Sequence, residues 1–200
     1  MSPFANNVRL EVVEERHIKD LARMRRSFLN TKHFCCCWPL GIGTEEEIRN
    51  EYKKCPDLMQ VAAVAIVPEM GVVGFVQMVF EGMPCNLHKV TPGEAYVFML
   101  AVDPEARGMG VGSALMKWAD GVAKDRDCAF MSLEVIHGNP AIGLYERKGY
   151  VVAKKPANSL FRRLIWAIPM CLFFGPVICP SGAPNYCSFG ITYYMEKSLQ

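Results

Sequence analysis

The feature that most constrains the fold is an apolar run, Ala95–Val102, that leads through Asp103 and Pro104 into a glycine-rich loop. Because the run is nearly all apolar, we expect a central strand that is covered on both faces. A helical pattern follows at once over Ser113–Lys124, with its apolar residues on one face. A buried strand, a tight turn and a helix in this order predict an α/β (α+β) domain.

The rest of the chain alternates strand-like and helix-like patterns in the same way. Thr44 and Glu47 have the spacing of a capping box, which predicts that a helix begins after Thr44. Two apolar strands around residues 68–71 predict a hairpin. We expect strands over residues 8–13, 61–67, 72–80, 130–136, 150–153 and 189–195, and helices over residues 18–28, 45–54 and 141–148.

The segment between the last two predicted strands differs from the rest in composition. Residues 147–195 contain no Asp or Glu, and residues 164–179 are almost continuously apolar apart from two prolines and a glycine. A membrane-spanning helix needs about 20 apolar residues, so this run is too short and is broken twice. We therefore expect a single domain over residues 1–200, with an insertion at about residues 156–188.

Composition excludes several classes of protein. Of 200 residues, 51% are hydrophobic and the net charge is only +2, so neither a disordered chain nor a nucleic-acid partner is indicated. Nine cysteines are an odd number, and with no apolar leader near Met1 they indicate reduced thiols in the cytoplasm. Adjacent thiols at Cys35–Cys37 do not converge easily on one ion, so we expect no metal there, nor at the widely spaced Cys171, Cys179 and Cys187.

The glycine-rich loop is the first candidate site. Gly108, Gly110 and Gly112 stand where a helix begins, so backbone N–H groups without helical partners gather at the positive end of the helix dipole. This pattern suits a pyrophosphate, although it also occurs in a simple strand-to-helix turn. The glycine spacing differs from that of the dinucleotide-binding fingerprint, which argues against a Rossmann domain.

Two motifs together resemble the GCN5-related N-acetyltransferase superfamily. Arg107-x-x-Gly110-x-Gly112, after Val102-Asp103-Pro104, is similar to the superfamily's coenzyme A loop. Leu133-Glu134-Val135, Asn139 and residues 141–150 resemble its fifth strand and next helix, in a form nearest to bacterial enzymes that acetylate the N-terminal alanine of a ribosomal protein. The resemblance covers residues 8–155 and 189–197, and it implies a mixed, mostly antiparallel sheet of about seven strands with about four flanking helices.

The resemblance implies that the protein moves an acetyl group from acetyl-CoA directly to a primary amine in a ternary complex. The amine belongs to a protein N-terminus, a lysine or a small molecule. No metal is implied. The residues expected to bind the coenzyme are Leu100, Ala101, Val102, Arg107, Gly108, Met109, Gly110, Val111, Gly112, Ser113, Asn139 and Tyr145.

Catalytic roles are likewise implied by the resemblance. Tyr145 is expected to donate a hydrogen bond to the departing thiolate, and Glu134 to accept the ammonium proton, with Glu94 as the alternative base. Asn139 is expected to contact the coenzyme arm, but it also suits a helix N-cap. The interval from Asn139 to the Ala141-Ile142 pair is one residue shorter than in the superfamily pattern, and Pro140 occupies it.

Alternatives remain open at this stage. The shortened interval and the apolar insertion also fit an acyl-CoA-binding interaction module without transferase activity. The insertion itself is interpreted in three ways: as a lid over the acceptor groove, as a surface for a partner protein, or as a membrane-interface wedge through residues 160–186. The protein is expected to be a monomer or a homodimer.

Overall fold

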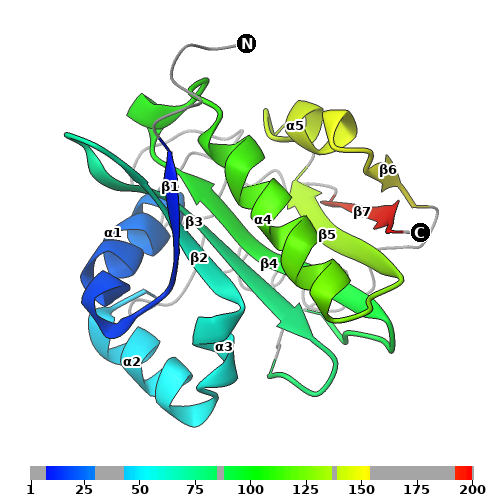
Figure 1. The fold of residues 1–200 in the computed structure, drawn as a ribbon, viewed down its shortest axis with the longest axis horizontal. Helices are drawn as coiled ribbons and strands as arrows, with labels where there is room; N and C mark the ends of the chain where they lie inside the picture. The colour runs from blue at the N-terminus through cyan, green and yellow to red at the C-terminus, as the bar shows by residue number, and fades with distance from the viewer. Residues whose placement is uncertain (1–7, 30–42, 85–87, 137–138, 154–191, 200) are drawn as a thin grey trace, which may run out of the picture.

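The computed structural model describes residues 8–29, 43–84, 88–136, 139–153 and 192–199 (Figure 1). The strands are β1 (Arg9–Val12), β2 (Ala62–Val67), β3 (Gly71–Phe80), β4 (Glu94–Val102), β5 (Phe130–Ile136), β6 (Val151–Val152) and β7 (Thr192–Ser198). The helices are α1 (Ile18–Leu29), α2 (Glu45–Lys54), α3 (Asp57–Gln60), α4 (Val111–Asp125) and α5 (Ile142–Arg147), with 3-10 turns η2 (Glu15–His17) and η3 (Pro104–Ala106).

The seven strands form one mixed sheet in the order β1-β2-β3-β4-β5-β7-β6. Among the described strands, only β4 and β5 run parallel, and α4 connects them; every other neighbouring pair is antiparallel. A parallel pair needs such a crossover, whereas β2 and β3 are joined by a tight hairpin. The predicted α/β (α+β) architecture with about seven strands is therefore confirmed.

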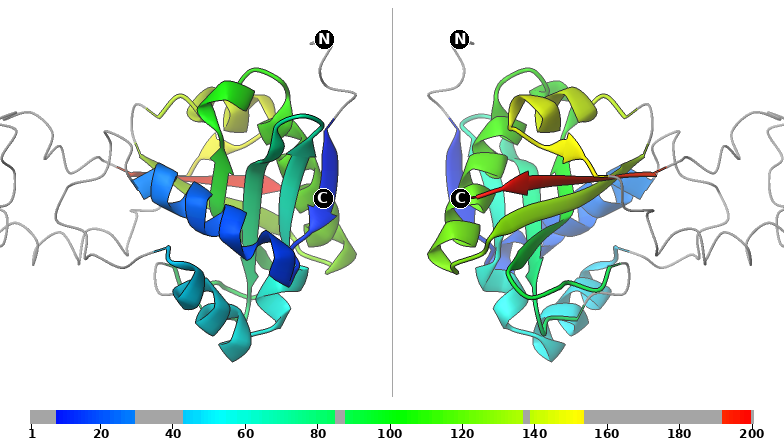
Figure 2. Two further views of the ribbon diagram at one scale, coloured as in Figure 1. Left: turned by 90° about the vertical axis from the view of Figure 1, so that its left-hand side faces the viewer. Right: turned by 90° about the vertical axis from the view of Figure 1, so that its right-hand side faces the viewer.

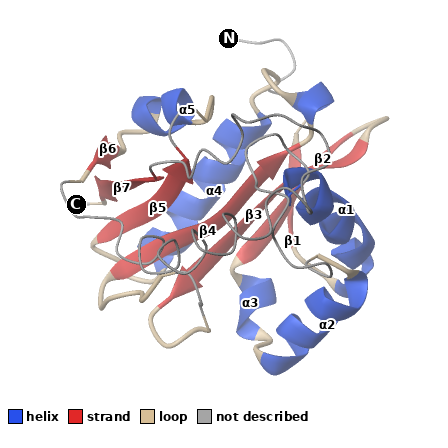
Figure 3. Ribbon diagram, turned by 180° about the vertical axis from the view of Figure 1, so that it is seen from behind, coloured by secondary structure: helices blue, strands red, loops and turns tan. Residues whose placement is uncertain are grey.

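Helices cover both faces of the sheet. Figure 1 looks onto the face that α4 crosses, and α4 lies behind the strands in the reverse view of Figure 3. The side views of Figure 2 show α1 and α2 on the face opposite α4. The core accordingly has two parts, an α4-side cluster that includes Leu115 and Tyr145 and an α1-side cluster that includes Leu21 and Phe75.

The strand β4 contributes to both parts of the core, which explains its unbroken apolar sequence. Ala95 and Val97 belong to the α4-side cluster, and Tyr96 and Ala101 to the α1-side cluster. The start of α2 also follows from its sequence. Thr44 Oγ1 accepts a hydrogen bond from the Glu47 amide at 3.2 Å, and the Glu47 carboxylate accepts one from the Thr44 amide, as the capping-box pattern predicts.

Element ends shift by one or two residues, as where α4 begins at Val111 rather than at Ser113, and two elements differ more from the sequence-based expectation. The helix α3 was not expected, because four residues are too few to show a helical period. The strand β7 ends at Ser198 rather than at residue 195, because it pairs along the whole of β5, from Phe130 with Ser198 to Ile136 with Thr192. The insertion at 156–188 and the Cys35–Cys37 run lie outside the described residues. Within the described residues, no helix has the length and apolarity needed to cross a membrane.

The packing of α4 on the sheet depends on Gly74 of β3. A Cβ atom at Gly74 would lie 2.6 Å from Val111 Cγ1 and 2.9 Å from Leu115 Cδ1, and both of these side chains are buried. Any side chain at position 74 would therefore push α4 away from the strands.

We expect Gly74→Ala to lower the free energy of unfolding by about 1–3 kcal/mol, because the added methyl group meets buried side chains that have no space to move. Gly121→Ala is the matched control: it lies in α4 with nothing within 4 Å of the added Cβ, so it should leave stability unchanged or raise it by up to about 1 kcal/mol. Urea unfolding followed by circular dichroism measures both. Equal stability of the two variants would contradict the close approach.

Candidate functional site

The parallel strands β4 and β5 are paired over only part of their length. Their register runs from Glu94 with Phe130 to Val97 with Leu133 and stops there. Both strands continue, β4 to Val102 and β5 to Ile136, without pairing to each other. A wedge-shaped gap in the backbone pairing therefore opens in the middle of the sheet.

A β-bulge in β4 lies where this pairing ends. Gln77 of β3 pairs with Met99 and the next residue, Met78, pairs with Val97, so Phe98 is an extra residue in β4. A bulge bends its strand and increases the local twist. The bend separates the second half of β4 from β5, so the edge of Leu100–Val102 that faces β5 has polar backbone groups with no partner on that strand.

The loop after β4 presents further unpaired donors. Gly108 and Gly110 have φ angles of 78° and 88°, which favour glycine, and α4 begins directly afterwards at Val111. Ala114 is the first residue of α4 whose amide donates within the helix, to the Gly110 carbonyl at 2.9 Å. Within the described residues, no acceptor is present for the amides of Gly108, Gly110, Val111, Gly112 and Ser113.

These amides lie at the positive end of the α4 dipole, on the loop before the helix and in its first turn. Arg107 and Gly108 are exposed, and nothing lies within 4 Å of a Cβ built on Gly108. At Gly112, by contrast, a Cβ would lie 3.1 Å from Leu144 Cδ2 of α5. The loop therefore has the donors and the access that a diphosphate requires, and Gly112 brings α5 close to the start of α4.

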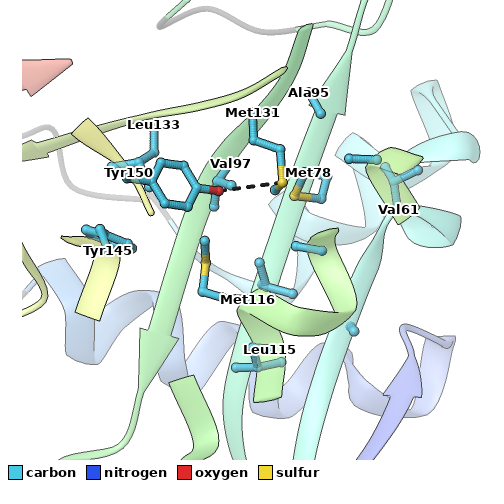
Figure 4. Close-up of a cluster of buried hydrophobic side chains, with 14 of the residues drawn as sticks. Val61, Met78, Ala95, Val97, Leu115, Met116, Met131, Leu133, Tyr145 and Tyr150 are labelled. Carbon is cyan, nitrogen blue, oxygen red and sulfur yellow. Dashed lines mark hydrogen bonds between the residues drawn. The ribbon is translucent and has the colours of Figure 1, made fainter. Parts of the chain in front are cut away.

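Tyr145 of α5 lies in the α4-side core, with its ring 6.0 Å from that of Tyr150 in an edge-on contact (Figure 4). The Tyr150 hydroxyl points to Met131 Sδ at 3.6 Å, whereas within the described residues the Tyr145 hydroxyl makes no hydrogen bond. Tyr145 is 7% exposed, and burial raises its pKa to about 12. The phenol therefore stays protonated at neutral pH and is available as a donor.

Asn139 precedes α5 and is engaged locally. Its Oδ1 accepts a hydrogen bond from the Ala141 amide at 2.9 Å, and its carbonyl accepts one from Ile142 at 3.1 Å. This geometry is that of a residue that stabilises the start of a helix. Contact between Asn139 and a coenzyme stays a prediction, for which the side-chain amide nitrogen remains the available group.

Glu134 stands on the α1 side of the sheet, at the first position of β5 beyond its pairing with β4. Its neighbours Leu133 and Val135 point into the α4-side core, so the alternation of a strand places Glu134 on the opposite face. Glu134 is partly exposed and lies opposite Tyr194 of β7. It therefore lies beside the wedge, where an amine approaching from the α1 side would meet it.

Glu94, the alternative base, is 2% exposed and fully engaged. Tyr194 donates to Oε1 at 3.0 Å, Ser132 donates to the same oxygen, and His88 Nε2 lies 2.7 Å from it. Thr91 donates to Oε2 through its amide at 2.8 Å and its hydroxyl at 2.7 Å. Burial on its own would raise the pKa of Glu94, but the hydrogen bonds from His88, Ser132 and Thr91 outweigh it and lower the pKa to about 2. A carboxylate of this kind is a poor proton acceptor, which favours Glu134 as the base.

The remaining candidates for a functional site, an open cleft and a metal centre, are less well supported. An open cleft of about 960 Å³ lies beside β1 and η3, but its arginines pair with acidic neighbours, as Arg16 does with Glu11 and Arg23 with Asp103. In the part of the chain that the structure describes, no group of three or more His, Cys, Asp or Glu residues is arranged to hold a metal ion.

Comparison with known proteins gives a consistent result. Residues 29–150 match the family model described as Acetyltransferase (GNAT) family, and no curated protein sequence matches significantly. Ard1 from Thermoplasma volcanium is similar in structure, with 20% identity, a TM-score of 0.59 and coverage of 97% of this chain and 99% of that one. The ribosomal-protein-S18-alanine N-acetyltransferase from Escherichia coli has 16% identity, a TM-score of 0.57 and coverage of 96% and 94%.

The PaiA N-acetyltransferase from Thermoplasma acidophilum, solved in complex with coenzyme A, is also similar. It has 14% identity, a TM-score of 0.60 and coverage of 96% of this chain and 98% of that one. At these identities the three structures establish a shared fold.

The lowered pKa of Glu94 predicts how stability depends on pH. Because the folded pKa is about 2 against an ordinary value of 4.5, this carboxylate stabilises the fold above about pH 4.5 and loses that effect as the pH falls towards 2. We expect Glu94→Gln to cost about 3 kcal/mol at pH 7 and to flatten the acid side of the stability curve.

Urea unfolding of wild type and Glu94→Gln between pH 2 and pH 7 measures this difference. Glu81→Gln is the control, since Glu81 is exposed and should leave the curve as in wild type. Parallel curves for wild type and Glu94→Gln would show that Glu94 contributes nothing to acid sensitivity.

Proposed function

The chain belongs to the acetyltransferase (GNAT) family and is an acetyl-CoA-dependent N-acetyltransferase, and from this premise we propose that it transfers the acetyl group directly to a primary amine held on the α1 side of the sheet. The observation that carries the proposal is the wedge between β4 and β5, which opens next to the unpaired amides of Gly108 and Gly110–Ser113. A long donor molecule suits these two features, because its diphosphate would bind the unpaired amides and the thioester at its other end would reach the wedge.

Binding of the donor is assigned to backbone groups. The amides of Gly108 and Gly110–Ser113 would hold the diphosphate, and the free edge of Leu100–Val102 would form strand-like hydrogen bonds with the amides of the pantetheine arm. Arg107, exposed at the start of the loop, adds positive charge nearby. The thioester would then lie in the wedge, between Tyr145 on the α4 side and Glu134 on the α1 side.

The transfer step needs few side chains. Glu134 takes a proton from the ammonium group, directly or through one water, and the neutral amine nitrogen forms a bond to the thioester carbonyl carbon. The bond from that carbon to sulfur then breaks, the nitrogen releases its second proton to solvent, and Tyr145 donates a hydrogen bond to the departing thiolate. Full proton transfer from a phenol of pKa about 12 to a thiolate whose conjugate acid has a pKa of about 8.5 is uphill by about 5 kcal/mol. A hydrogen bond is therefore the role that suits Tyr145.

An assay of thiol release tests the proposal. Acetyl-CoA is incubated with the protein and with peptides, polyamines, amino sugars or aminoglycosides, and free thiol is measured. Saturable release with at least one amine is expected. Coenzyme binding in titration calorimetry without release by any amine would contradict the proposal and support a binding module instead. The cytoplasmic location, the oligomeric state and the role of residues 156–188 stay predictions.

We expect Tyr145→Phe to lower kcat about 10- to 100-fold while leaving the Kd for acetyl-CoA nearly unchanged, because only the hydrogen bond to the thiolate is lost. Stopped-flow or steady-state thiol release gives kcat, and calorimetry gives the Kd. Tyr150→Phe is a matched control, since the one hydrogen bond of the Tyr150 hydroxyl among the described residues is that to Met131 Sδ. Unchanged turnover in Tyr145→Phe would contradict the assigned role.

Glu134→Gln should lower kcat/KM by about 10²-fold or more near pH 7, because a general base is lost. The deficit should shrink as the pH rises towards the pKa of the acceptor amine, where a growing fraction of amine is already neutral. A pH profile of wild type, Glu134→Gln and the exposed control Glu146→Gln measures both effects. A deficit that is constant with pH would indicate a structural role for Glu134.

A further inference from the structure

A buried arginine with unused donors lies on the α1 side of the sheet. Arg25 of α1 is 7% exposed, and its Nη1 donates to Glu51 Oε2 of α2 at 2.6 Å. Its Nε and Nη2 atoms are buried and have no hydrogen-bond partner in the described structure. Buried guanidinium groups are usually fully hydrogen-bonded, so this arrangement lacks a ligand for two donors.

The two unused donors belong to the same edge of the guanidinium group. Nε and Nη2 carry N–H groups that point in parallel, and this pair matches the two oxygens of a carboxylate. The third nitrogen, Nη1, is occupied by Glu51 on the other edge. The two remaining donors of Arg25 are therefore arranged to bind both oxygens of one carboxylate.

The neighbours of Arg25 do not supply a second negative charge. Glu51 contacts Nη1 alone and its side chain is 35% exposed. Burial raises the pKa of Tyr52 well above its usual value despite the Arg25 charge, so this phenol is neutral, and it donates to Gln77. The Phe75 ring lies 6.0 Å from the guanidinium carbon and offers a cation–π contact without a charge.

The position of Arg25 assigns this donor pair to the acceptor rather than to the coenzyme. Phe75, beneath the guanidinium group, pairs with Ala101 in the separated half of β4. Both lie in the α1-side core, on the face that carries Glu134, whereas the amides of residues 108–113 belong to the start of α4 on the other face. An anion on Arg25 would therefore enter with the amine.

We propose that Arg25 binds a carboxylate of the acceptor substrate through its Nε and Nη2 donors, so that the enzyme selects amines that carry a carboxylate. The proposal rests on the function proposed above and specifies its substrate class. It disfavours polyamines and aminoglycosides, which have no carboxylate.

The spacing of the strands indicates which carboxylate fits. Arg25 lies over β3 and Glu134 stands on β5, with the wedge between them, so the two groups lie farther apart than two paired strand spacings, which amount to about 10 Å. In a free α-amino acid the amine and the carboxylate share one carbon atom and do not span this distance. An acidic side chain near the N-terminus of a peptide does, since each extended residue adds about 3.4 Å.

The test compares Ala-Glu-Ala-amide with Ala-Gln-Ala-amide as acceptors in the thiol-release assay, with free glutamate and spermidine as further probes. Wild type should use the glutamate peptide with a kcat/KM about 10- to 100-fold higher, mostly through KM, because a charge-assisted hydrogen-bonded pair is lost with glutamine. If wild type prefers free glutamate to the peptide, Arg25 still binds a carboxylate, but the acceptor is a free amino acid rather than a peptide.

Variants separate recognition from a structural role. Arg25→Met should remove the preference for the glutamate peptide while leaving kcat/KM for the glutamine peptide within about twofold of wild type. Arg25→Lys keeps the charge but loses the paired donors, so it should reduce the preference about tenfold and serves if Arg25→Met does not fold. Arg26→Met, an exposed neighbour, is the control.

Equal use of the two peptides by wild type, or an equal loss for both in Arg25→Met and Arg25→Lys, would overturn the inference. Both results are obtained only if the protein releases thiol from acetyl-CoA, so they leave the proposed function intact. Absence of release with every amine, together with coenzyme binding, would instead overturn the proposed function.

Discussion

The separation of β4 from β5 is the constraint on which the rest of the structure depends. A sheet loses hydrogen bonds where two neighbouring strands part, so the paired half must be held firmly. Glu94 does this at the paired end of β4, because its carboxylate accepts hydrogen bonds from Ser132 of β5 and Tyr194 of β7. At the other end of the gap, the close approach of α4 to β3 at Gly74 holds the glycine-rich loop of residues 108–112 against the sheet. Packed and hydrogen-bonded contacts therefore border the opening at both of its ends.

Much of this architecture is readable from the sequence because it rests on local patterns. The apolar run of β4, the capping box at Thr44 and the glycines before α4 each determine an element from a few neighbouring residues. The sequence therefore predicts the succession of strands and helices along the chain and the position of the glycine-rich loop. By contrast, α3 is too short to show a period, and the end of β7 is determined by its pairing with β5.

The chemistry of the site depends on contacts between distant residues, and single-sequence patterns do not contain them. The bulge at Phe98 follows from the register between β3 and β4. Glu94 and Glu134 are both strand carboxylates in the sequence, and only the folded structure shows that Glu94 is a buried anchor and that Glu134 is partly exposed beside the wedge. The unused donors of Arg25 likewise emerge only when α1, α2 and β3 are brought together, since one arginine among many has no distinguishing sequence signal.

The place of β7 in the sheet has a consequence for biosynthesis. This strand follows all the others along the chain, yet it lies between β5 and β6. While the ribosome is still making residues before 192, β5 has an open edge and β6 has no neighbour with which to pair. The nascent chain must therefore wait for its final strand before the sheet closes, and during that interval the β5 edge is a surface for chaperones to protect.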